Sequence, residues 1–366
     1  MENASLTAIA GITAGHVTDQ LNLTGVTVVR FAGDGATAAV SVQGAAPGTR
    51  ETDLLEPGNL VEKVHAIVLT GGSAYGLDAA SGVMAALEAE GVGLPVSEDT
   101  VVPIVPAAVL FDLQVGSSRV RPNPQWGYDA AQDANDAPIP SGNVGAGTGA
   151  TVGKLLGPSR ATKGGLGSAL MRLDNGVVVS ALVAVNAVGE VVDTKRNATI
   201  AGIRADDVGY YESAVDIALG TLQDDITLGT NTTLGLIATN ASLSKSQLKK
   251  VAEMAHDGMA RAIRPIHTQF DGDTVFAVSM PGADADLTTS AEPRLINSIG
   301  IAAAQVLELR RLAHAVEAAV DRADVPLNAG DALLAVAEQA PAAELLDLVA
   351  AALARMQLLL LRLLCC

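Results

Sequence analysis

Cysteine is almost absent from this chain of 366 residues. The two cysteines that it has, Cys365 and Cys366, occupy the last two positions. A disulfide framework and a cysteine-ligated metal site are therefore excluded. Aromatic residues make up only 2% of the chain, and the five histidines are scattered without any His-x-x-x-His pair. The sequence thus predicts no metal site.

Basic residues are also scarce. Lysine and arginine number 23 against 40 acidic residues, which gives a formal charge of -17. Nucleic acid would repel such a chain, and no basic stripe offsets the charge, so a nucleic-acid partner is excluded. A hydrophobic content of 49% together with 37 glycines excludes a disordered chain. The length allows two or three domains, or one large layered domain.

Neither terminus has the pattern of a membrane segment. Residues 1–19 contain no basic region and no long apolar run, so no secretory signal is expected. The longest apolar stretch, residues 345–364, is interrupted by Asp347, Arg355 and Arg362. A membrane span needs about 20 nearly uninterrupted apolar residues, so we expect a helix that faces a partner. The predicted compartment is the cytoplasm.

Short apolar runs separated by glycine turns predict a series of strands. They are expected at residues 26–31, 38–42, 65–70, 166–172, 177–185, 234–239 and 274–280. The first two are expected to pair across the turn at residues 33–35. The run 177–185 is continuously apolar, which predicts burial on both faces of its sheet.

Helices are predicted where apolar residues recur at helical spacing. One follows Gly72, a second begins at Ser242 or Ser244, and the chain is rich in helix-forming residues from Arg294 onward. The polar, proline-rich stretch 114–140 is predicted to be a loop. Strands and helices thus come in blocks without strict alternation, which favours layered sheets covered by helices.

A glycine-rich segment, residues 142–154, invites comparison with a phosphate-binding loop. A Walker loop needs Gly-x-x-x-x-Gly-Lys-Ser/Thr, but Leu155 follows Lys154. The dinucleotide fingerprint also fails, because no strand precedes these glycines. We therefore interpret them as positions of tight backbone packing.

The segment from Gly229 to Thr239 places hydroxyl residues at the start of an apolar strand. On the residues alone, Asn231-Thr232-Thr233 fits a loop that enters a strand, and it also matches a glycosylation sequon. The pattern becomes informative only together with other segments of the chain. Five of them occur in this order: Gly11–Asp19, Leu69–Asp78, Gly145–Lys154, Asn231–Thr233 and His267–Phe276.

Together these segments resemble the DmpA-type peptidases, the group that includes the nylon-oligomer endo-hydrolases. The resemblance covers residues 8 to 307. It implies a four-layer αββα sandwich and a chain that cuts itself before its nucleophile. The implied parts are an α part at 1–231, a β part at 232–309 and a helical extension at 310–366 with no counterpart in relatives.

The resemblance implies that the bond between Asn231 and Thr232 is cut. A threonine hydroxyl is a poor nucleophile unless a base accepts its proton. Cutting this bond frees the α-amine of Thr232, whose reference pKa is about 7.7–8.0. That amine can act as the base for its own hydroxyl.

Further site residues carry over by motif. Asp271 and Asp273 would hold and polarise the amine and hydroxyl of the nucleophile, although Asp-Gly-Asp alone also fits a solvated turn. Asn186 would donate to the oxyanion, and otherwise fits a hydrogen-bonded strand end. Lys154 would border the site, or else is a surface charge. Phe111 stands in the substrate site where many relatives carry tyrosine, so a hydroxyl is missing there.

The implied activity is hydrolysis of linear amides without a cofactor, on small peptides or 6-aminohexanoate oligomers. The α and β parts would stay together and form a homo-oligomer, a tetramer of αβ units in relatives, with no nucleic-acid or membrane partner. Two alternatives stay open. One is acyl transfer of the ornithine acetyltransferase type, and the other is a catalytically weak assembly protein.

Overall fold

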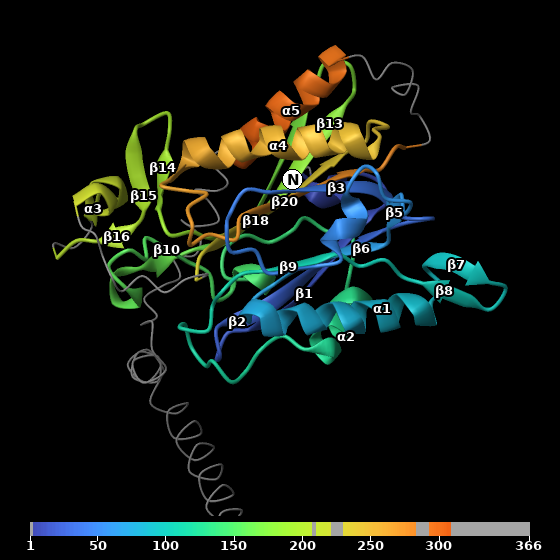
Figure 1. Ribbon diagram of the computed structural model, residues 1–366, viewed down its shortest axis with the longest axis horizontal. Helices are drawn as coiled ribbons and strands as arrows, with labels where there is room; N and C mark the ends of the chain where they lie inside the picture. Colours follow the sequence, from blue (N-terminus) through green and yellow to red (C-terminus); the bar gives the residue numbers. More distant parts are fainter. Residues whose placement is uncertain (1–2, 207–209, 221–229, 283–292, 309–366) are drawn as a thin grey trace, which may run out of the picture. The chain divides into compact units, whose positions relative to one another are not determined.

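The computed structural model describes residues 3–206, 210–220, 230–282 and 293–308 (Figure 1). The predicted extension at 310–366 lies outside these residues. Two large sheets form the centre of the described part. No helix within it is long and apolar enough to cross a membrane.

The first sheet has five strands, and most neighbours in it are antiparallel. β6 and β9 are the parallel exception. The order is β1 (Ile12–Asp19), β2 (Thr24–Phe31), β6 (Ala66–Thr70), β9 (Ala107–Val109) and β4 (Thr49–Arg50).

The second sheet has six strands and carries two of the five motif segments. Its order is β12 (Gly165–Arg172), β13 (Val178–Asn186), β18 (Thr232–Thr239), β20 (Thr274–Ser279), β3 (Ala36–Val42) and β5 (Lys63–Val64). The two motif segments are Asn231–Thr233 at the start of β18 and His267–Phe276 leading into β20. β18 is antiparallel to β13 and parallel to β20. Every residue of β13 and β18 is buried, which confirms the predicted burial on both faces of the run 177–185.

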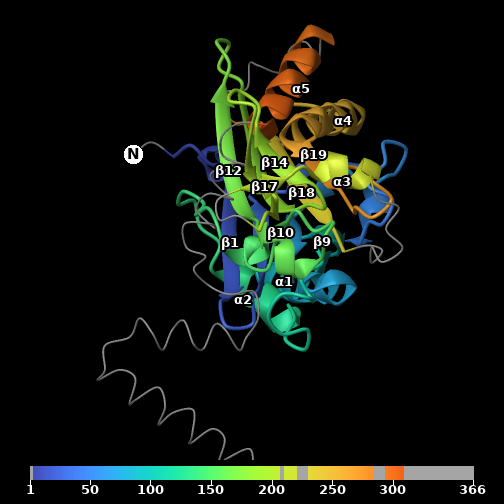
Figure 2. The same ribbon diagram turned by 90° about the vertical axis from the view of Figure 1, so that its left-hand side faces the viewer.

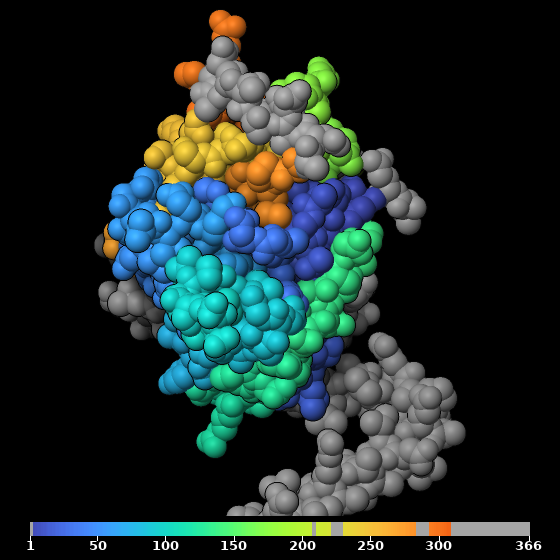
Figure 3. Space-filling view, turned by 90° about the vertical axis from the view of Figure 1, so that its right-hand side faces the viewer, coloured from blue at the N-terminus to red at the C-terminus, as the bar shows by residue number. Residues whose placement is uncertain are grey.

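Helices cover the outer faces of both sheets, so the chain forms a four-layer αββα sandwich, as the resemblance implied (Figures 1 and 2). Helices α1 (Ala79–Ala89) and α2 (Pro124–Gln132) pack on the five-stranded sheet. Helices α4 (Lys245–Ala262) and α5 (Pro293–Glu308) pack on the six-stranded sheet. In Figure 3, α4 is yellow, residues near position 100 are cyan, and N-terminal residues in blue lie between these two regions.

Three apolar layers hold the sandwich together. One lies between the two sheets and contains Leu69, Leu182 and Phe276. The others lie under the helix pairs, for example around Val68 and Val183. Successive strand residues point to opposite faces of a sheet, so the side chains of β13 contribute to two of these layers. Burial of apolar area on this scale is the main favourable contribution to folding.

Shorter elements complete the described part. They are η1 (Leu6–Ala8), η2 (Thr52–Leu55), η3 (Ser73–Asp78), β7 (Leu94–Ser97), β8 (Thr100–Val102), η4 (Gly145–Gly147), β10 (Thr151–Val152), η5 (Pro158–Arg160), β11 (Thr162–Lys163), β14 (Glu190–Asp193), β15 (Ala198–Ala201), β16 (Ile203–Arg204), β17 (Tyr211–Glu212), α3 (Ala214–Gly220) and β19 (Ile263–Arg264).

Two predictions of local structure are wrong. The stretch 114–140 is not all loop, because it contains α2, where the Asn123 side chain accepts from the Trp126 backbone N–H and Pro124 opens the first turn. The runs 26–31 and 38–42 do not pair either. β2 and β3 belong to different sheets, so the turn at Gly33–Gly35 carries the chain from one sheet to the other.

Candidate active site

The fold brings the predicted site residues to one end of the six-stranded sheet. Thr232 is the first residue of β18 and lies opposite Asn186, the last residue of the antiparallel β13. β20 runs parallel to β18, so the residues just before β20 lie at the same end, and Asn231 forms a bridge with Asp271. Strand direction alone therefore gathers residues that are far apart in the sequence.

The peptide bond between Asn231 and Thr232 is buried at the centre of this end. The Asn231 carbonyl oxygen accepts the Gly272 backbone N–H at 2.8 Å and the Thr232 hydroxyl at 2.5 Å. A Cβ atom on Gly272 would come within 2.7 Å of the Thr232 Oγ1. A side chain there would displace the hydroxyl, so glycine leaves both the carbonyl and the hydroxyl in place.

Asn186 is fully buried, and both ends of its amide are occupied. Its Oδ1 accepts the Thr151 backbone N–H at 3.0 Å and the Lys154 Nζ at 2.8 Å. Its Nδ2 donates to the carbonyl oxygens of Phe111 at 3.1 Å and Thr230 at 3.4 Å. Two donors face one end and two acceptors face the other, which fixes the orientation of the amide. Phe111 thus meets the site through its backbone.

Lys154 lies inside the site and is not a surface charge. Its Nζ donates to Asn186 O, Asn186 Oδ1 and Thr230 O, at 3.0, 2.8 and 3.0 Å. An ammonium has three N–H bonds, so the charged form satisfies all three acceptors. Burial acts against that charge and lowers the pKa of Lys154 to about 7, while Asp271 raises it. The group is therefore balanced between its two forms near neutral pH.

Asp271 has one occupied and one unoccupied oxygen. Its Oδ2 accepts the Thr268 backbone N–H at 2.8 Å and the Thr268 hydroxyl at 2.6 Å. Its Oδ1 is buried and meets no hydrogen-bond donor among the described residues. Burial, and then the nearby charge of Asp273, raise the pKa of this carboxyl to about 6.

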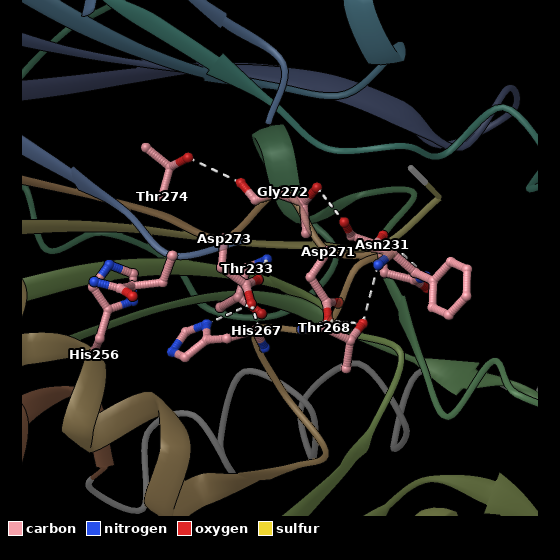
Figure 4. A network of polar contacts seen from close by, with 12 residues as sticks. Asn231, Thr233, His256, His267, Thr268, Asp271, Gly272, Asp273 and Thr274 are labelled. Carbon is pink, nitrogen blue, oxygen red and sulfur yellow. Dashed lines mark hydrogen bonds and ion pairs between the residues drawn. The ribbon is translucent and has the colours of Figure 1, made fainter. Parts of the chain in front are cut away.

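Asp273 is also fully buried, but both of its oxygens are occupied. Its Oδ1 accepts the Thr233 backbone N–H at 2.6 Å. Its Oδ2 accepts the His267 backbone N–H at 3.1 Å and the His267 Nδ1 at 2.8 Å (Figure 4). The carboxylate therefore connects the residue after Thr232 to the loop before β20.

Unpaired buried polar atoms are concentrated at this site. Buried polar atoms usually have a partner, and exceptions are costly and gather at functional sites. Within the described ranges, six side-chain atoms are buried without a partner, and five of them lie here: Asn231 Oδ1, Thr233 Oγ1, His256 Nδ1, His267 Nε2 and Asp271 Oδ1.

Sequence reasoning assigned no role to three residues that contact this site: Gly272, His267 and Thr268. His267 stands at the start of a recognised motif, so its position was visible in the sequence while its contact was not. The described residues contain no group of three histidine, cysteine or acidic side chains that could hold a metal ion.

The chain is similar in sequence to a known protein family and to several known proteins. The model of peptidase family S58 matches residues 4–347. A protein of Mycobacterium leprae (strain TN), named an uncharacterized aminopeptidase, is 42% identical over 89% of this chain and 93% of its own length. The 6-aminohexanoate-oligomer endohydrolase of Paenarthrobacter ureafaciens is 33% identical over 81% of this chain and 82% of its own.

Solved structures share the fold. A beta-aminopeptidase of Burkholderia sp. matches with a TM-score of 0.60 at 21% identity, over 86% of both chains. The L-aminopeptidase D-Ala-esterase/amidase of Ochrobactrum anthropi, described as a new variant among the Ntn hydrolase fold, matches with a TM-score of 0.61 at 17% identity, over 87% of this chain and 86% of its own.

The family match also extends past residue 307, where the resemblance stated from the sequence ends. The expectation that the segment after this point has no counterpart in relatives is therefore wrong for at least part of it. The motifs, the αββα layers and the two relatives agree, and the resemblance to DmpA-type peptidases is confirmed: the chain belongs to peptidase family S58.

Proposed function

We propose that this protein is an amide-bond hydrolase that cuts its own chain between Asn231 and Thr232 and then uses Thr232 as its nucleophile. The observation that carries the proposal is the buried Asn231–Thr232 peptide bond. Its carbonyl oxygen accepts both the hydroxyl of Thr232 and the N–H of Gly272. Family membership and the names of the relatives support the same reaction class.

The first reaction is an acyl shift within the chain. The Thr232 Oγ1 attacks the carbonyl carbon of Asn231, and negative charge develops on the Asn231 oxygen. The Gly272 N–H already points at that oxygen, so it would stabilise the charge without reorganisation. The C–N bond then breaks, the nitrogen gains the proton that the hydroxyl lost, and an ester remains. The amine of Thr232 is free from this point. Water then hydrolyses the ester, which releases the carboxyl group of Asn231 and restores the Thr232 hydroxyl.

Two groups can carry protons during this first reaction, when the amine is still part of a peptide bond. The pKa of Lys154 is lowered to about 7 and that of Asp271 is raised to about 6, in each case mainly by burial. Groups that titrate near the working pH are the most effective acids and bases. We assign proton transfer during self-cleavage to these two side chains.

The second reaction hydrolyses an external amide. The freed amine of Thr232 accepts the proton of its own hydroxyl, which attacks the substrate carbonyl. The N–H groups of Asn186 contact Phe111 O and Thr230 O in the uncut chain. Once the end of the α part can move away, we expect one N–H of Asn186 to turn to the substrate oxyanion.

The substrate class we propose is a linear amide: the N-terminal residue of a small peptide or an oligomer of 6-aminohexanoate. The named activities of the relatives support it. We further propose that the α and β parts remain associated and that the cut molecules form homo-oligomers.

Intact mass and N-terminal sequencing test self-cleavage, and turnover of peptide p-nitroanilides and of the 6-aminohexanoate dimer tests hydrolysis. We expect two fragments, the smaller beginning Thr-Thr-Leu. A chain that stays whole at 37.0 kDa and is fully active would refute the assigned nucleophile. A cut chain that transfers acyl groups to added amines but does not hydrolyse amides would establish the acyltransferase alternative.

A further inference from the structure

Asp273 holds the backbone of the residue that follows the nucleophile. Its Oδ1 accepts the Thr233 N–H at 2.6 Å, inside a fully buried environment. Once the bond to Asn231 is cut, Thr232 is tethered to the chain through Thr233 alone. The hydrogen bond to Asp273 therefore gains importance after self-cleavage, because it fixes the first peptide unit of the new N-terminus.

The orientation of Asp273 depends in turn on His267. Both the backbone N–H and the ring Nδ1 of His267 reach the same oxygen, Asp273 Oδ2, at 3.1 and 2.8 Å. The Nδ1 faces a carboxylate oxygen, so it carries the proton and donates. The Nε2 is buried and meets no hydrogen-bond partner in the described part of the chain.

The backbone of His267 is held in an uncommon conformation to make these contacts. Its φ is +57°, a region that side-chain-bearing residues visit rarely and that asparagine, aspartate and histidine tolerate best. With this backbone, the N–H and the ring of one residue point to the same side. The strained conformation is thus coupled to the double contact with Asp273.

A second histidine holds the His267 ring in place from the side. The ring of His256, on α4, meets the ring of His267 edge-on with 4.8 Å between centroids (Figure 4). The His256 Nε2 lies 3.1 Å from the Ser41 carbonyl oxygen, to which it donates. Burial lowers the pKa of His256 to about 4, so this neighbour adds no charge at neutral pH.

We propose that His267 is a positioning residue for the reactions at Thr232, which it serves by orienting Asp273 and, through Asp273, the Thr233 backbone. The role rests on the proposed function, because it concerns the same nucleophile. It goes beyond the residues that the family motifs identify as catalytic, since His267 contacts neither the scissile bond nor Thr232 in the described structure.

The test compares two substitutions that both tolerate the backbone of residue 267. His267→Gly keeps the positive φ and removes the ring donor. His267→Asn also accepts this conformation and places a side-chain N–H close to where Nδ1 was. The matched control is His16→Asn, on β1, where the ring Nδ1 contacts the Thr27 hydroxyl at 3.0 Å and no site residue.

We expect the His267→Gly variant to lose about ten- to a hundredfold in the rate of self-cleavage or in kcat, the effect of removing one hydrogen bond to a charged group. KM should change little, since the proposed role of His267 is to orient Asp273 and not to bind substrate. His267→Asn should recover most of the loss, and the His16→Asn control should match the original chain.

A His267→Gly chain that cuts itself and turns over at the original rates would overturn the role, as would an Asn variant as slow as the Gly variant. An original chain that neither cuts itself nor hydrolyses amides would instead refute the proposed function as a whole. Proton NMR of histidine-labelled protein gives a readout independent of activity. A far-downfield Nδ1–H signal should be present and should be lost in His267→Asn, whereas a chain without that signal would contradict the hydrogen bond to Asp273.

Discussion

Two buried carboxylates near strand ends, Asp112 and Asp271, differ in what their oxygens contact. Both are almost completely buried, and burial raises the pKa of each. Asp112 Oδ1 accepts the Gly72 N–H and its Oδ2 accepts the Thr24 hydroxyl, each at 2.7 Å. Asp271 has one oxygen with two donors and one with none among the described residues.

Each carboxylate has a lysine nearby, and the two lysines differ in what they contact. The Lys163 Nζ donates to the carbonyl oxygens of Thr148 and Ala150 at 2.7 and 3.0 Å. Burial lowers the pKa of Lys163 to about 8, and the charge of Asp112 acts against that lowering. The Lys154 Nζ contacts Asn186 and Thr230 beside the bond to be cut. The comparison teaches that burial of charge alone does not identify the active site. What distinguishes the candidate site is the set of unpaired polar atoms beside the Asn231–Thr232 bond, which we propose is cut.

The largest effect should come from the nucleophile. Thr232→Ala should abolish both self-cleavage and turnover, because it removes the hydroxyl that serves both reactions. Thr232→Ser should retain part of each, since the hydroxyl and the amine remain. Intact mass and a p-nitroanilide assay measure the two reactions. Residual turnover in the alanine variant would mean that another nucleophile acts.

A substitution at Asp112 should lower the stability of the fold without abolishing self-cleavage. Asp112→Ala leaves the Gly72 N–H and the Thr24 hydroxyl buried without their acceptor and removes the charge near Lys163. We expect a loss of about 2–5 kcal/mol in the free energy of unfolding. Urea unfolding measures it. Asp112 also acts to raise the pKa of Lys154, so its removal should lower that pKa further. Any of the variant that folds should still cut itself, and a stable but uncut variant would break the distinction between the two sites.

Asp271 should behave in the opposite way. Its pKa is about 6 in the folded chain and 3.8 in the reference state, so the stability that this group supplies is complete below about pH 4 and is lost as pH rises through 6. At pH 8 the chain must bury a charged carboxylate. In an uncut Thr232→Ala background, Asp271→Asn should therefore gain about 1–3 kcal/mol in unfolding free energy at pH 8.

The same substitution should bring little or no gain at pH 4, where the carboxyl is already protonated. Urea unfolding at both pH values measures this difference. Equal effects of Asp271→Asn at pH 4 and pH 8 would contradict the raised pKa. In the cleavable chain, Asp271→Asn should slow self-cleavage, so that stability and activity change in opposite directions.

The smallest structural change with a specific effect is Gly272→Ala. The added methyl group would come within 2.7 Å of both the Thr232 Oγ1 and the Ala46 carbonyl oxygen. It would therefore shift the hydroxyl away from the Asn231 carbonyl, or move the backbone of residue 272 that donates to that carbonyl. We expect self-cleavage to slow by about tenfold or more, since positioning errors near 1 Å can cost a hundredfold. A time course of intact mass measures it. An unchanged rate of self-cleavage would show that the reaction does not depend on the observed position of the Thr232 hydroxyl.

Much of the sandwich could be predicted, because strand burial and helix spacing are local patterns. The run 177–185 and the helix after Ser244 are cases in which periodicity and a capping residue were sufficient. That β2 and β3 belong to different sheets could not be predicted. β2 pairs with its sequence neighbour β1, but β3 pairs with β20, which is distant in sequence. The helix in 114–140 was missed because its cap, Asn123-Pro124, lies in a polar, proline-rich stretch.

The candidate site shows the same limit. The motifs alone predicted that Thr232, Asp271 and Asp273 belong to one site. In the structure, the strand directions bring them to one end of one sheet. The hydrogen-bond partners of each side chain could not be predicted from the sequence. Asp271 has one oxygen without a donor among the described residues, whereas His267 donates to an oxygen of Asp273. These contacts depend on side-chain directions, which the spacing of residues in the sequence does not determine. The catalytic roles assigned to these residues remain predictions.

The central claim is that turnover requires the freed amine of Thr232. The most direct test follows the fraction of cut chain by intact mass while turnover of a peptide p-nitroanilide is measured in the same samples. Thr232→Ser, which we expect to cut itself more slowly, supplies partly cut samples if the original chain is fully cut when purified. The account predicts turnover proportional to the cut fraction and none when that fraction is zero. Uncut chain that hydrolyses the substrate as fast as cut chain would contradict it.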